Sequence, residues 1–227
     1  QALDSARAVS DDEGLHERLL RQTLKALGEM DLRESPPAMA QRIHRLIRTE
    51  TGLEDPYREI KDRCNRLALG LYDELERRVG EAPDPLEVAV RIAIAGNVID
   101  FGVRSEISDA EIHAALESCF EQPLSADAVA ELADATSRAE SILYLADNAG
   151  EIVFDRLLIE RMPPGRVTVG VKSGPVINDA TLADAVEAGL TDVAEVIDNG
   201  SDAPGTILAD CDEAFRRRFE QADVVIA

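Results

Sequence analysis

The stretch that decides the fold reads Ile142-Leu-Tyr-Leu-Ala-Asp-Asn-Ala-Gly-Glu-Ile-Val-Phe-Asp155. Its first residues are apolar and favour a β-strand, and its last residues begin an amphipathic helix. Asp147 and Asn148 lie between them, at the carboxyl end of the strand, where open α/β sheets bind ligands. Their oxygens suit a divalent cation, and the following helix N-terminus suits a phosphate group. The alternative is a simple helix cap, since Asp and Asn are favoured there.

The same alternation continues to the end of the chain. A strand over residues 166–172 leads through Asn178 and Asp179 into a helix over 182–188. A strand over 192–197 leads into a loop rich in Asp, Asn, Gly and Ser, and we expect a helix over 207–221 with Asp210 on its outer side. A last strand follows over 223–227. Strands that alternate with helices predict a three-layer, mostly parallel, Rossmann-like sheet with these loops along one edge.

Helical signals dominate before residue 140, so we expect a helical bundle over residues 1–139 and an α/β domain over 140–227. The run from Leu86 to Ile99 is nearly all apolar and predicts a buried helix. Asn97 and Asp100 share one face at its end. They either cap the helix or face a cleft between the two parts and contact the ligand.

Composition excludes several classes of function. The formal net charge of −21 repels phosphate backbones and argues against nucleic-acid binding, and the aromatic content of 4% argues against a stacking platform. No apolar run reaches the roughly 20 residues that span a bilayer. Three widely spaced cysteines, Cys64, Cys119 and Cys211, form no metal motif and fit a reducing cytoplasm. The sequence leaves the oligomeric state open.

Several motifs resemble those of a known family. The relevant segments are Asp55-Pro-Tyr-Arg-Glu-Ile-Lys-Asp-Arg-Cys-Asn65, Ala95-Gly-Asn-Val-Ile-Asp-Phe-Gly102, Ala146-Asp-Asn-Ala-Gly-Glu151, Lys172-Ser-Gly-Pro-Val-Ile-Asn-Asp-Ala-Thr181 and Asp198-Asn-Gly-Ser-Asp-Ala-Pro-Gly-Thr206. In this order they resemble the metal-dependent damage-control phosphatases (ARMT1-like metal-binding domain), most closely the prokaryotic branch. Members of that branch commonly carry a Cys-x-x-Cys pair before such a sequence and a Lys-Gly-x-Gly-Asn loop after it. We therefore expect this sequence to be the ordered part of a longer protein.

The resemblance implies a phosphatase that hydrolyses phosphate monoesters of small metabolites. It places a divalent cation (Mn²⁺, Mg²⁺, Ni²⁺ or Co²⁺) on Asp147, Asn148 and Asp179. It makes Asp147, Asp179 and Lys172 the catalytic residues, with Lys172 near the phosphate. The implied substrate-binding residues are Asn97, Asp100, Glu151, Asn178, Asp198, Asn199, Gly200, Ser201 and Asp202.

Two other functions share these features. A methyltransferase that uses S-adenosylmethionine also has a doubly wound sheet with acidic residues at strand ends, but it needs more glycines after the first strand than Gly150 alone supplies. A non-catalytic module that binds a phosphorylated metabolite would need the same loops. Cofactor binding without metal would indicate the first, and ligand binding without turnover would indicate the second.

Overall fold

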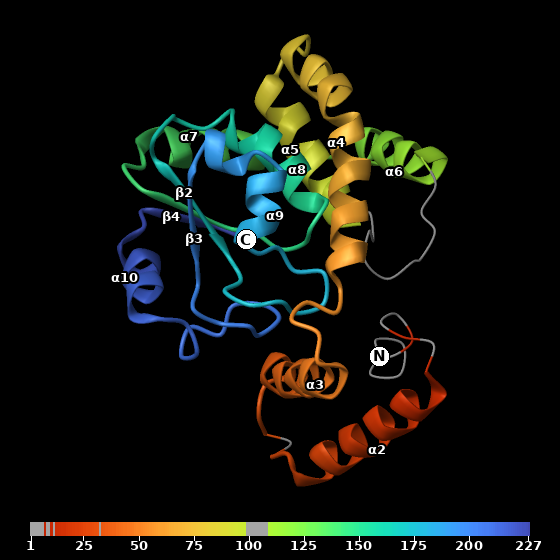
Figure 1. Cartoon of the computed structure of the whole chain (residues 1–227). Helices are drawn as coiled ribbons and strands as arrows, with labels where there is room; N and C mark the ends of the chain where they lie inside the picture. The colour runs from red at the N-terminus through yellow and green to blue at the C-terminus, as the bar shows by residue number, and fades with distance from the viewer. Residues whose placement is uncertain (1–6, 8–9, 11, 32, 99–108) are drawn as a thin grey trace.

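The computed structural model describes residues 7, 10, 12–31, 33–98 and 109–227 (Figure 1). Its first half is helical, as the apolar spacing predicts, and Pro residues begin two of the helices. The helices described there are α2 (Glu13–Glu29), α3 (Pro36–Thr51), α4 (Arg58–Gly80), α5 (Pro85–Val98), α6 (Asp109–Glu121) and α7 (Ala126–Arg138).

The second half alternates strands and helices. Its elements are β1 (Ile142–Leu145), α8 (Glu151–Ile159), β2 (Val167–Val171), α9 (Leu182–Glu187), the 3₁₀ turn η1 (Leu190–Asp192), β3 (Glu195–Asp198), α10 (Glu213–Gln221) and β4 (Val224–Ile226). The strands form one sheet in the order β3-β2-β1-β4, and every pairing is parallel. The α/β prediction is confirmed, and the carboxyl ends of the strands share one edge.

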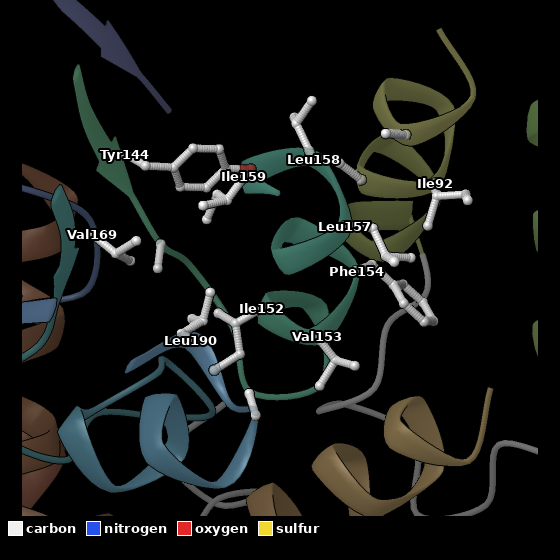
Figure 2. Packing of buried hydrophobic residues seen from close by; sticks show 14 of the residues in the cluster. Ile92, Tyr144, Ile152, Val153, Phe154, Leu157, Leu158, Ile159, Val169 and Leu190 are labelled. Carbon is white, nitrogen blue, oxygen red and sulfur yellow. The ribbon is translucent and has the colours of Figure 1, made fainter. Parts of the chain in front are cut away.

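Helix α8 lies between the sheet and the helical half of the chain. Figure 2 shows Ile152 on the side of β1 and β2, and Phe154 on the side of α5 and Ile92. Phe154 and Ile152 are fully buried. Gly96 of α5 permits this close approach, because a Cβ there would lie 2.9 Å from the Phe154 ring. One core cluster therefore includes residues from both sides of position 140, and the division into two domains there stays a prediction.

Helix α10 covers the opposite face of the sheet (Figure 1). Phe215 packs against Gly170 of β2, where a Cβ would lie 2.7 Å from the ring. The predicted helix over 207–221 is wrong in its first part, since α10 begins at Glu213. Asp212 caps α10 by accepting a hydrogen bond from the Phe215 N–H, and its own N–H donates to the Asn199 carbonyl. Asp212 therefore marks the start of α10, and the residues before it form turns instead of helix.

Helix α3 lies beside the loops at the carboxyl edge of the sheet (Figure 1). It packs against α2 through a small separate cluster that contains Leu15, Leu19 and Ile47. Ser35 caps α3, and Gly52 ends it in a left-handed conformation. The polar residues of α3 face the loops after β2 and β3 and contact them.

Candidate active site

Backbone hydrogen bonds join the turn after β1 to the loop after β2. The Ala180 N–H donates to the Asp147 carbonyl at 2.7 Å, and the Ala149 N–H donates to the Asn178 carbonyl at 2.8 Å. Together they form an antiparallel bridge between Asn148 and Asp179. The fold thus brings Asp179 beside Asp147 and Asn148, which lie more than 30 residues earlier in the sequence.

The loop after β3 joins the same edge. The Asn199 N–H donates to the Val171 carbonyl at 2.9 Å, and the Ser173 N–H donates to the Ser201 carbonyl at 3.0 Å. The three loops that the sequence predicts at one edge therefore form a continuous surface.

Asp179 has the least satisfied side chain of this surface. Its carboxylate is buried, and Oδ2 has no hydrogen-bond partner among the described residues. The pKa of Asp179 is raised to about 7, mainly by burial; the nearby Lys172 ammonium opposes the rise and the Asp147 carboxylate adds to it. Buried carboxylate oxygens normally accept hydrogen bonds, so this oxygen is available to bind a ligand such as a cation.

Lys172 is buried beside this carboxylate. Its Nζ lies 3.6 Å from Oδ2 of Asp179 and donates a hydrogen bond to the Gly205 carbonyl. Its backbone N–H donates to the Ala180 carbonyl. A fixed positive charge at the end of β2 is suited to a phosphate group in a chain that is otherwise strongly acidic.

Glu151 connects α5 to the turn after β1. It accepts hydrogen bonds of 3.1 Å from the amide nitrogens of Asn97 and Asn148. Burial raises the pKa of Glu151, and these two hydrogen bonds oppose the rise. Because its nitrogen is held by Glu151, Asn148 has its carbonyl oxygen as the atom suited to bind a cation. Asn97 thus lies near the turn after β1, whereas Asp100 lies outside the described residues.

Two of the predicted substrate contacts, Asp198 and Asn199, accept hydrogen bonds within their own loop. Oδ1 of Asp198 accepts from the Gly200 N–H at 3.0 Å, and Oδ1 of Asn199 accepts from the Ser201 N–H at 2.9 Å. Gly200 has φ of 73° and lies close to Asp212, so a Cβ would clash there. These residues shape the loop, and their contact with a substrate stays a prediction, as it does for Asn178.

Asp202 binds α3. It accepts hydrogen bonds from Gln41 at 2.8 Å, from Arg45 at 3.0 Å and from Arg48, and Arg48 also donates to the Pro175 carbonyl. Partial burial alone would raise the pKa of Asp202, but these donors outweigh it and lower the pKa to about 2. Helix α3 therefore fastens the loops after β2 and β3.

Sequence reasoning missed this contribution of α3. Its polar residues look like the solvated face of an amphipathic helix. Asp210 was also placed wrongly, because it lies in the turn before α10 and accepts hydrogen bonds from Gln41 and from Ser201. No local pattern indicates pairs that are more than 150 residues apart.

The residues present fit a divalent cation. Three hard oxygen donors lie on adjoining backbone. They are Oδ2 of Asp179, which accepts no hydrogen bond among the described residues, the oriented amide of Asn148 and the exposed carboxylate of Asp147. No group of three or more His, Cys, Asp or Glu side chains in the described ranges is arranged for a metal. The predicted ligands are two carboxylates, Asp147 and Asp179, and one amide, Asn148, so they form a different kind of group.

Comparison with known proteins gives consistent results. A family model described as the damage-control phosphatase ARMT1-like domain matches residues 1–227. The chain is 33% identical to a damage-control phosphatase of Archaeoglobus fulgidus, across 98% of this chain and 78% of that protein. It is 36% identical to an uncharacterized protein of Methanocaldococcus jannaschii, across 100% of this chain and 76% of that protein.

A solved structure shares the fold. The crystal structure of a DUF89 family protein from Pyrococcus horikoshii matches with a TM-score of 0.89 and 31% identity, across 100% of this chain and 79% of that one. A damage-control phosphatase of Pyrococcus horikoshii is 37% identical across 78% of this chain and 61% of that protein. In the part of the chain with described structure, no helix has the length and apolar character to cross a membrane.

Proposed function

The chain belongs to the damage-control phosphatase ARMT1-like family, and from this premise we propose that it is a divalent-metal-dependent phosphatase acting on phosphate monoesters of small metabolites. Its relatives support a phosphatase role in metabolite repair. Dependence on Mn²⁺, Mg²⁺, Ni²⁺ or Co²⁺, a sugar phosphate, nucleotide or damaged metabolite as substrate, and a cytoplasmic location are our proposals.

One observation carries the proposal. A buried carboxylate oxygen of Asp179 has no hydrogen-bond partner in the described structure, and the backbone holds it beside Asn148 and next to the Lys172 ammonium. A cation on Asp147, Asn148 and Asp179 would satisfy this oxygen. When bound, it would supply Lewis-acid polarisation of a phosphoryl oxygen and a lowered pKa of water.

The protein's own groups would position the substrate. Lys172 offers a fixed positive charge to the phosphate, and phosphoryl transfer depends mainly on such positioning and charge stabilisation. Glu151 orients the Asn148 amide and is itself held by Asn97. The loops after β2 and β3 would contact the rest of the substrate. The residues proposed for this contact are Asn178, Asp198, Asn199, Gly200, Ser201 and Asp202.

The test is phosphate release by metal-stripped protein after addition of each cation, with p-nitrophenyl phosphate and a panel of phosphorylated metabolites as substrates. Asp147→Asn should lower kcat/KM by about two orders of magnitude or more, because the lost charge weakens both cation binding and transition-state stabilisation. Asp73→Asn, an equal charge change on the exposed side of α4, should leave activity unchanged. Wild-type protein that binds the metabolites without releasing phosphate under any cation would refute the proposal.

A further inference from the structure

Helix α4 carries two buried polar side chains, Lys61 and Asn65, on consecutive turns. Both are fully buried, as are Cys64 and Ala68 beside them. An ammonium and an amide in such surroundings cost stability unless their hydrogen bonds are made. Their partners in the second half of the chain lie in the turn after β1 and in α9, the helix that follows the loop after β2.

Asn65 holds the turn after β1. Its Oδ1 accepts a hydrogen bond of 2.7 Å from the N–H of Gly150. Gly150 has φ of 85° and is the N-cap residue of α8, two residues after Asn148. The amide nitrogen of Asn65 donates to Glu187 of α9 at 2.8 Å. One side chain therefore bridges the β1 turn and the helix that follows the β2 loop.

Lys61 holds the loop after β2. Its Nζ lies 2.8 Å from Oδ2 of Asp184 and 3.0 Å from Oδ2 of Asp55. Asp184, which is fully buried, accepts hydrogen bonds from the N–H and hydroxyl of Thr181 at 2.9 and 2.6 Å. Thr181 follows Asp179 by two residues, so Lys61 fixes that loop from the side of α4.

We infer that Asn65 and Lys61 are positioning residues that set the separation between the loop carrying Asp147 and Asn148 and the loop carrying Asp179. Cation ligands must be held within fractions of an ångström, and groups behind them supply that rigidity. The backbone bridge between Asn148 and Asp179 joins the two loops directly. Asn65 supports the first loop through Gly150, and Lys61 supports the second through Asp184, which holds Thr181. The inference rests on the proposed function for its link to catalysis.

The test measures Mn²⁺ affinity by titration calorimetry on the full chain, together with amide hydrogen exchange at Gly150. Asn65→Leu keeps the number and branching of the side-chain heavy atoms and removes the hydrogen bonds. We expect Mn²⁺ binding to weaken by about 10- to 100-fold, as is usual when a group behind a metal ligand is lost. Exchange at Gly150 should become faster.

Leu75→Ala is the matched control, because Leu75 lies on the same helix and is buried in the main core. It should lower the thermal midpoint and leave the Mn²⁺ affinity unchanged below that midpoint. Wild-type affinity in Asn65→Leu, or an equal loss in Leu75→Ala, would overturn the inference. If Asn65→Leu does not fold, Glu187→Ala removes the α9 partner of Asn65 from a partly exposed position, and unchanged affinity in that variant also overturns it.

The two proposals fail separately. If wild-type protein binds Mn²⁺ with an affinity that Asn65→Leu weakens, yet releases no phosphate, the positioning inference is supported and the phosphatase proposal is refuted. If wild-type protein is an active phosphatase and Asn65→Leu binds Mn²⁺ equally well, the positioning inference alone is refuted.

Discussion

Lys172 and Asp179 form a buried ion pair at the carboxyl edge of the sheet, with Nζ 3.6 Å from Oδ2. At this distance the charges attract without forming a hydrogen bond, and Oδ2 of Asp179 keeps its capacity for another partner. A buried ion pair in which the carboxylate oxygen accepts no hydrogen bond is a costly arrangement for stability alone. It is suited to a site that receives a metal cation and a phosphate together.

Replacement of Lys172 should therefore impair catalysis. We expect Lys172→Met to lower kcat/KM for a phosphate monoester by about two orders of magnitude, because the variant loses the positive charge that we propose to stabilise the phosphoryl group. Lys25→Met, an equal change at an exposed position of α2, should have no effect. Activity of Lys172→Met within about threefold of wild type, measured as phosphate release at saturating Mn²⁺, would exclude a role for Lys172 in charge stabilisation.

Asn97 should affect activity more than stability. Its side chain is exposed and gives one hydrogen bond to Glu151, so Asn97→Ala should cost at most about 1.5 kcal/mol of folding free energy. We expect a thermal midpoint within about 5 °C of wild type and a clear loss of kcat/KM. Ile94→Ala, at an exposed site on the same helix, should stay fully active. A fully active but clearly less stable Asn97→Ala variant would assign Asn97 a structural role.

The ion pair between Arg48 and Asp202 should contribute to stability. Both side chains are mostly buried, with 20% and 12% of their surfaces exposed. Removal of Arg48 leaves Asp202 with Arg45 and Gln41, so we expect Arg48→Ala to lower the unfolding free energy by about 1–3 kcal/mol.

Arg42→Ala is the control for this measurement in a urea titration. Arg42 pairs with Glu34 on the surface of the protein, and such pairs contribute about 1 kcal/mol or less. Equal losses of unfolding free energy in the two variants would show that the contact of Arg48 with Asp202 stabilises the protein no more than a surface ion pair does.

His44 should make the folded state sensitive to acid. Burial and, to a smaller extent, the Arg48 charge lower the pKa of His44 from its ordinary value of 6.5 to about 4. The unfolded chain therefore binds the proton more tightly, and stability is lost as the pH falls from about 6.5 toward 4.

The loss that His44 causes should reach about 2 kcal/mol at pH 5. We would measure the free energy of unfolding by urea titration at several pH values between 7.5 and 5 and take its slope against pH. Over this range the free energy of unfolding should fall by about 2 kcal/mol less for His44→Gln than for wild type. His113→Gln, at an exposed position, should keep the wild-type slope. Identical slopes for wild type and His44→Gln would show that His44 does not carry the effect.

The strand-to-helix turns were readable from the sequence because their signals are local. The apolar run before Asp147 and the amphipathic run after Glu151 fix a strand and a helix by periodicity, and β1 and α8 occupy those segments. The predicted start of the last helix failed at residue 207 because the capping hydrogen bonds of Asp212 were not visible in that pattern.

The sequence by itself determined that Asp and Asn residues end neighbouring parallel strands, and parallel pairing places such ends at one edge. Only the tertiary structure decided what holds them. Asn65 reaches Gly150 across 85 residues, and Asp202 is held by α3 across more than 150. Periodicity reports which face of an element is buried, whereas these partners are selected when separate elements pack and each buried polar group must find a hydrogen bond.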